Sequence, residues 1–153
     1  MPLLLTKAQS EFTKLIDKNS PLFVGHPSNQ AGVAANWSNL LFNYAGAVIP
    51  PSTTGAVATQ AAKAILLGAT APNSFFPALV QAYTAFANSL ASGMTSGGSG
   101  VAPPIPINFA PILALPLSDN STPQIISLFA NITDGWFRTG TFIPTSGGSV
   151  PWS

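Results

Sequence analysis

Residues 73–91 read NSFFPALVQAYTAFANSLA and carry a wide aromatic and aliphatic face at helical spacing. Asn73 or Ser74 can cap this segment, and Pro77 falls in the first turn, where its missing N–H costs nothing. We therefore predict a helix at the centre of the core. An aromatic ligand box is the alternative, although apolar stripes of this kind are far more often core. The face consists of Phe76, Leu79, Val80, Tyr83, Phe86, Ala87 and Leu90.

A second helix is predicted over residues 31–48. Ser28 or Asn29 can cap its first turn, and the Pro50-Pro51 pair ends it. Its predicted buried stripe is Val33, Trp37, Leu40, Leu41, Tyr44 and Val48.

Residues 54–67 and 123–137 predict two more helices. The first takes its cap from residues 52–54 and closes at Gly68. It is expected to present one side made of Val57, Ala61, Ala64 and Ile65. The second begins at a proline and spaces Ile125, Phe129, Ile132 and Trp136 along one face.

Residues 3–18 form the only conventionally amphipathic helix that the sequence predicts. Five of the nine charges of the chain lie here, so we expect this helix to face water. The spacing of four residues also predicts attraction between Lys7 and Glu11, and between Asp134 and Arg138. The five charges are Lys7, Glu11, Lys14, Asp17 and Lys18.

Two segments rich in proline and glycine predict extended arms. Residues 92–121 combine a flexible Gly/Ser linker with a Pro-rich arm, and they follow a helical domain of four helices over residues 1–91. Residues 122–138 form a fifth helix packed on that domain, and residues 139–153 a C-terminal arm. The predicted fold class is all-α, one compact domain of about five short helices with extended arms. The apolar arm residues expected to contact a neighbour are Ile105, Ile107, Phe109, Ile112, Phe142, Ile143 and Trp152.

Charge is scarce along the chain. Only 6% of the 153 residues are charged, whereas a soluble domain usually has about a quarter. Lys63 is the single formal charge between Asn19 and Ser118. A neutral exterior of this kind resists aggregation poorly, which favours a subunit covered by neighbouring subunits. A net charge of +1 gives no electrostatic basis for nucleic-acid binding.

The residues needed for catalysis or metal binding are few. The chain has one histidine, His26, and no cysteine. A hydrolase would depend on His26, and no Gly-x-Ser-x-Gly motif accompanies it. Asp119 and Asp134 could serve as a glycosidase pair only on weak grounds. We therefore expect no enzyme, no cofactor and no metal site, with His26 in a hydrogen-bonding or interface role.

We expect neither a signal peptide nor a membrane-spanning helix. The N-terminal residues lack the pattern of a signal peptide, and prolines interrupt both apolar stretches, so a spanning helix is not expected.

Several short motifs resemble those of small Ala/Pro/Gly-rich structural proteins of large tailed bacteriophages and related contractile particles. The motifs are the Pro-Pro-Ser-Thr-Thr turn at 50–54, the Pro-rich segment 103–109, the Trp-containing helix end at 136–141 and Pro151-Trp152. The resemblance covers residues 31–153 and implies a virion component of tail, baseplate or neck, made in the host cytoplasm. A capsid cement protein fits equally well.

The sequence thus predicts a structural subunit whose partners are other proteins of the same particle or copies of itself. Nucleic acid, a small-molecule substrate and a membrane are not expected partners. The alternative from another class is a membrane-active or lipid-binding helical protein that uses its neutral faces.

Overall fold

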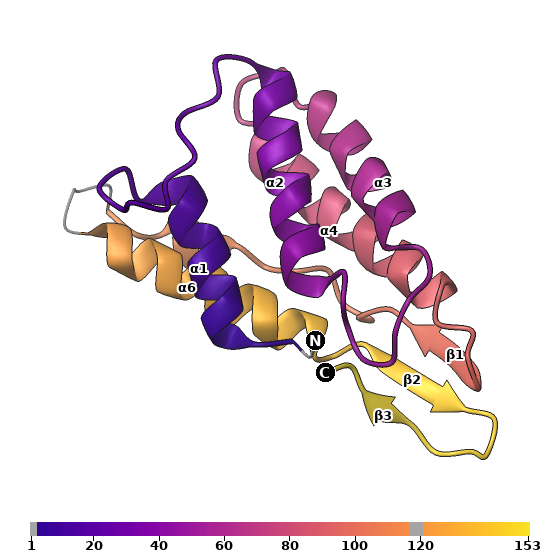
Figure 1. The fold of residues 1–153 in the computed structure, drawn as a ribbon. Coiled ribbons are helices and arrows are strands. Elements are labelled where there is room, and N and C mark those ends of the chain that lie inside the picture. The colour runs from indigo at the N-terminus through magenta and orange to yellow at the C-terminus, as the bar shows by residue number, and fades with distance from the viewer. Residues whose placement is uncertain (1–2, 117–120) are drawn as a thin grey trace.

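A computed structural model describes residues 3–116 and 121–153, and these are mostly helical (Figure 1). The six helices in this part of the chain are α1 (Leu5–Ile16), α2 (Gln30–Ala45), α3 (Gly55–Leu67), α4 (Phe75–Ser92), α5 (Ala110–Leu113) and α6 (Thr122–Phe137). Three short strands, β1 (Gly98–Val101), β2 (Thr141–Pro144) and β3 (Val150–Pro151), form one antiparallel sheet in that order.

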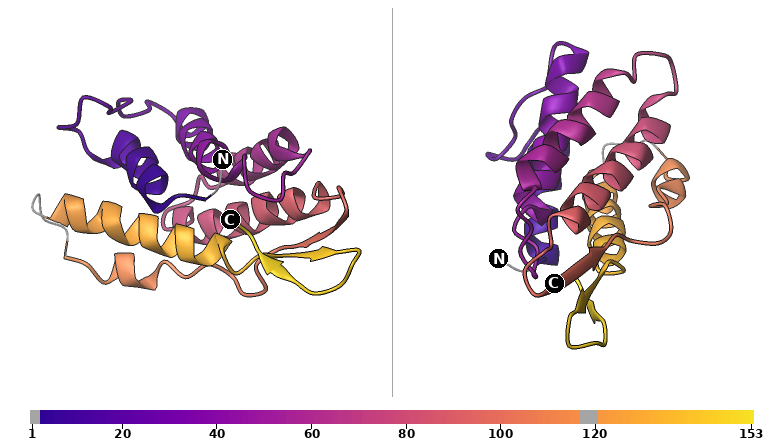
Figure 2. Two further views of the ribbon diagram at one scale, coloured as in Figure 1. Left: turned by 60° about the horizontal axis from the view of Figure 1, so that its bottom comes forward. Right: turned by 90° about the vertical axis from the view of Figure 1, so that its right-hand side faces the viewer.

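The longer helices form two layers (Figure 2). One layer contains α1, α2 and α3, and the other contains α6 and α4, with α1 on α6 and α3 on α4. The sheet lies at one end, where β1 packs beside α4. The core therefore lies between the two helical layers and extends beneath the sheet.

The prediction of α4 as the core helix is confirmed. Its buried face follows the predicted spacing, and Pro77 lies in the first turn. The Ser74 side chain makes no cap bond, and its hydroxyl donates to the Ala71 carbonyl at 2.5 Å. Fully buried side chains along α4 are Leu79, Ala82, Tyr83, Phe86, Ala87 and Leu90.

The start of α2 also follows the prediction. Asn29 Oδ1 accepts a 2.9 Å hydrogen bond from the Gly32 amide, as an N-cap residue should. Leu40, Leu41 and Tyr44 are buried on the predicted stripe.

The predictions for α3 need two corrections. Its buried side chains include Ala58, Ala62 and Leu66, whereas Val57 is 62% exposed. Thr54 occupies the N-cap position without capping, because its hydroxyl donates instead to the Ser89 carbonyl near the end of α4. The Thr54 hydroxyl thus holds the end of α4 in place. The small side chains of the alanines let α3 lie close to its two neighbours, α2 and α4.

Only part of α1 faces water. Ala8, Glu11 and Phe12 are buried on this helix, which packs on α6 and α2. Glu11 pairs with Lys14 at 2.5 Å and accepts a 3.1 Å hydrogen bond from Asn43, so the predicted partner Lys7 does not form the ion pair. The second predicted pair is confirmed, with Arg138 Nε 2.8 Å from Asp134 Oδ2.

The predicted all-α class holds only in part, because the mostly helical fold also contains a small sheet. Residues 98–101, predicted as part of a flexible linker, form β1 and pair with β2. Glycine allows this strand to lie against α4: a Cβ on Gly100 would stand 2.6 Å from the Ala91 carbonyl oxygen. The predicted C-terminal arm likewise contains the β2–β3 hairpin. Residues 117–120, which belong to the predicted segment 92–121, lie outside the described part of the chain.

Candidate functional site

The structure divides the seven predicted interface residues into two groups. Two are exposed: Ile105 by 71% and Ile143 by 43%. The other five pack into the core of this same chain, so in the structure they offer no surface to a neighbour. The buried five are Ile107, Phe109, Ile112, Phe142 and Trp152.

The Pro-rich segment is fixed to the helices by its alternating side chains. Phe109 packs between aromatic rings of α4 and α6, with centroids 5.3 Å from Tyr83 and 5.6 Å from Phe129. The Trp136 indole N–H donates a 2.6 Å hydrogen bond to the Ile105 carbonyl. The backbone at Ile105 is therefore held in place while its side chain extends into solvent.

The C-terminal residues are held as firmly. Trp152 is 1% exposed, and its indole N–H donates to the Thr141 carbonyl at 2.9 Å. Its backbone amide donates to Gly140 at 2.9 Å, and a Cβ at Gly140 would meet the indole ring at 2.5 Å. Trp152 therefore holds the C-terminal segment in place, and the residues that bury its ring belong to its own subunit, whereas the sequence predicts contact with a neighbour.

One face of the sheet remains uncovered by the described residues. Val101 pairs with Thr141, and Ile143 pairs with Ser99, so these side chains project to the same side. Phe142 projects to the opposite side, into the core. We call this surface the outer sheet face: Ser99, Val101, Thr141, Ile143 and Pro151. It carries no charge, and Val101 and Ile143 are each more than 40% exposed.

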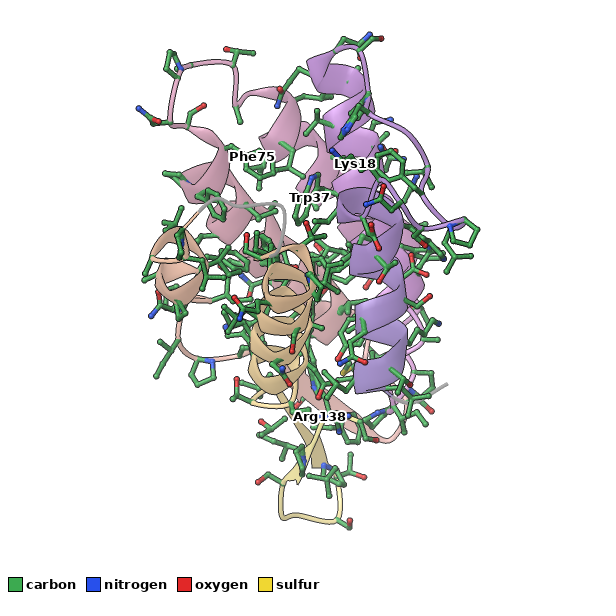
Figure 3. All side chains as sticks on the ribbon, turned by 90° about the vertical axis from the view of Figure 1, so that its left-hand side faces the viewer. Lys18, Trp37, Phe75 and Arg138 are labelled. Carbon is green, nitrogen blue, oxygen red and sulfur yellow. The ribbon has the colours of Figure 1, made fainter. Side chains whose placement is uncertain are left out.

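A pocket of about 420 Å³ lies between the helices. Figure 3 labels two of its aromatic residues, Trp37 and Phe75, whose ring centroids lie 5.4 Å apart. Every lining side chain is apolar, and the set, named here the apolar pocket, is Ile16, Trp37, Phe75, Phe76, Ile112, Leu113, Leu115, Ile125 and Phe129. Among the predicted interface residues only Ile112 belongs to it.

The titratable groups near the core hold helices together. Tyr44 Oη donates to Asp134 Oδ1 at 2.5 Å, and Arg138 Nη2 donates to the Leu3 carbonyl at 2.5 Å. Burial, together with the bond to Asp134, raises the pKa of Tyr44, and Asp134 raises the pKa of Arg138. Burial raises the pKa of Tyr83 too, so both tyrosines stay neutral. The cluster ties α2 and α6 to the N-terminal segment.

His26 lies apart from these groups. It is exposed in the loop before α2, with its ring edge-on to Phe23 at 5.0 Å. Within residues 3–116 and 121–153, no three His, Asp or Glu side chains could share a metal ion. Asp134 is engaged with Tyr44 and Arg138, and its proposed carboxylate partner Asp119 lies outside the described residues.

The sequence pattern missed Val101 and Leu113 as surface residues. Val101 stands two residues before Pro103 in a segment that looks like a linker, and only the pairing with β2 places it beside Ile143. Leu113 is 63% exposed because α5 is a single short turn against α6. The alternation of Gly98 and Gly100 with Ser99 and Val101 is the one available signal.

None of the helices described here is long and apolar enough to cross a membrane. No protein-family model matches the chain, and no curated protein or solved structure shows significant similarity to it.

Proposed function

We propose that this chain is a structural subunit of a large protein assembly. The observation that carries the proposal is the outer sheet face, where Val101 and Ile143 lie exposed without a charged side chain among them. Surfaces that combine exposed apolar side chains with an absence of charge are typical of interfaces between subunits.

Exposed apolar side chains elsewhere support the same function. In the described residues, Ile105, Leu113 and Val57 are each more than 60% exposed. The five Lys/Arg and four Asp/Glu of the whole chain give such a surface little electrostatic repulsion. Contact with several neighbours, rather than one, accounts for apolar side chains on the sheet, the Pro-rich segment and α3.

The most specific form of the proposal is a virion component of tail, baseplate or neck type, suggested by the resemblance of the short motifs. A capsid cement protein is the alternative within the same class. Both place the chain among other structural proteins of one particle, and neither requires catalytic residues.

Gradient sedimentation of extracts from the native source tests the proposal. The chain is expected in a high-mass fraction together with a fixed set of other proteins. A chain found only at its monomer mass of 15.7 kDa contradicts the proposal. Flotation of the purified chain with liposomes would instead support the membrane-active alternative.

A further inference from the structure

The apolar pocket has the size of a small-molecule site. Its volume of about 420 Å³ falls within the roughly 300–1,000 Å³ of ligand pockets. Five helices contribute to it, because Ile16 comes from α1, Trp37 from α2, Phe75 and Phe76 from α4, Ile112 from α5 and Ile125 from α6.

The lining selects an apolar occupant. All nine lining residues are aliphatic or aromatic, so they offer a ligand almost no hydrogen-bonding partner apart from the Trp37 indole N–H. An engineered apolar cavity of about 150 Å³ stays dry and binds benzene. Scaled from that cavity, the pocket holds up to about 17 carbon atoms, which leaves room for a 12-carbon chain.

A cation lies beside the apolar pocket. Lys18 lines a neighbouring hollow with Asp17 and Asn19, and Ile16 lines both cavities. Figure 3 labels Lys18, Trp37 and Phe75 toward the same end of the molecule. In the described residues the two ion pairs are Glu11–Lys14 and Asp134–Arg138, so neither involves Lys18.

We propose that the apolar pocket binds the hydrocarbon chain of a carboxylate amphiphile, with the carboxylate placed at Lys18. The aliphatic and aromatic walls remove the chain from water, and the cation favours an anionic head group over a neutral one. Asp17 partly offsets this preference, although it already accepts a 3.0 Å hydrogen bond from the Asn19 amide. The inference adds a ligand to the chain and does not depend on the proposed assembly role.

Dodecanoate is the probe, and dodecanol is the matched uncharged probe. Titration calorimetry is expected to show one site per chain below the micellar concentration of dodecanoate. Shortening the probe should weaken binding by about fourfold per methylene, as burial of the chain requires. Fluorescence of Trp37 should change, and Trp37→Phe should remove that change while Trp136 and Trp152 remain. Absence of saturable binding by both probes overturns the proposal.

Two pairs of variants locate the site. Lys18→Ala is expected to weaken dodecanoate binding about threefold to fivefold and to leave dodecanol unchanged, whereas Lys63→Ala on α3 should alter neither. Leu113→Asp places a carboxylate on the pocket wall and should abolish dodecanoate binding. Val57→Asp is its matched control, because Val57 is 62% and Leu113 63% exposed.

Two results would contradict the assignment. Equal loss of binding in Leu113→Asp and Val57→Asp would place the ligand elsewhere. Loss of particle incorporation in Leu113→Asp, with no dodecanoate binding by the unmodified chain, would show that a neighbouring protein fills the pocket instead. Circular dichroism of each variant confirms that the fold is retained.

Discussion

Ile49 and Ser153 exchange two backbone hydrogen bonds, at 2.7 Å from the Ile49 amide and 3.0 Å from the Ser153 amide. The pair joins the loop after α2 to the residue that follows Trp152. Together with the buried indole of Trp152, it makes the C-terminal segment part of the folded subunit.

Trp152→Ala is therefore expected to lower the free energy of unfolding by about 3–5 kcal/mol, because it removes a large buried ring. Urea unfolding followed by circular dichroism measures the change. Ile143→Ala, at an exposed position of the same hairpin, should change stability by less than about 0.5 kcal/mol. Equal stability of Trp152→Ala and the unmodified chain would show that residues 139–153 form a free arm.

Gly140→Ala is expected to destabilise the fold by about 1–3 kcal/mol, since the added methyl group would meet the Trp152 ring at 2.5 Å. Gly135→Ala is the matched control: its Cβ would meet nothing within 4 Å, and it lies inside α6. Alanine there should stabilise the helix by up to about 1 kcal/mol. Thermal unfolding should show a lower melting temperature for Gly140→Ala and a higher one for Gly135→Ala. A change in the same direction for both variants would contradict the packing of Trp152 on Gly140.

Alkaline pH should destabilise the protein through its buried tyrosines. Tyr44 and Tyr83 have raised pKa values in the fold, so above the ordinary tyrosine value of about 10 only the unfolded chain loses these protons. Each tyrosine should then cost about 1.4 kcal/mol of stability per pH unit. Urea unfolding between pH 9 and about pH 11.5 measures the slope. Tyr44→Phe should reduce the slope of the free energy of unfolding against pH by the contribution of one proton. An unchanged slope would show that Tyr44 ionises in the folded protein.

The sequence predicted the helices that depend on local signals. The face of α4 and the Asn29 cap follow from residues three or four apart, which is why both appear as expected. Strand β1 forms where the sequence predicts a linker, because Gly98 and Gly100 have no strand propensity and the partner strand β2 lies some 40 residues further along the chain.

The candidate surfaces were predicted less well for a related reason. Alternation predicts that Ile105, Ile107 and Phe109 share one side of an extended segment, but it does not show that the core of the same chain covers Ile107 and Phe109 while Ile105 stays exposed. The apolar pocket depends on five helices meeting at one end, and no spacing within one helix reveals such a meeting.

The outer sheet face is the most direct place to test the assembly role. The double variant Val101→Lys with Ile143→Lys adds two charges where both side chains are exposed, so the fold should be retained with the same helical circular dichroism. Ser146→Lys with Ser149→Lys adds the same charge to the exposed hairpin tip and serves as the control.

The decisive measurement is gradient sedimentation of these two double variants in the native source. We predict that the sheet variant leaves the high-mass fraction and sediments as a free subunit, while the hairpin-tip variant stays incorporated. Incorporation of both variants at the level of the unmodified chain would contradict the outer sheet face as an interface between subunits.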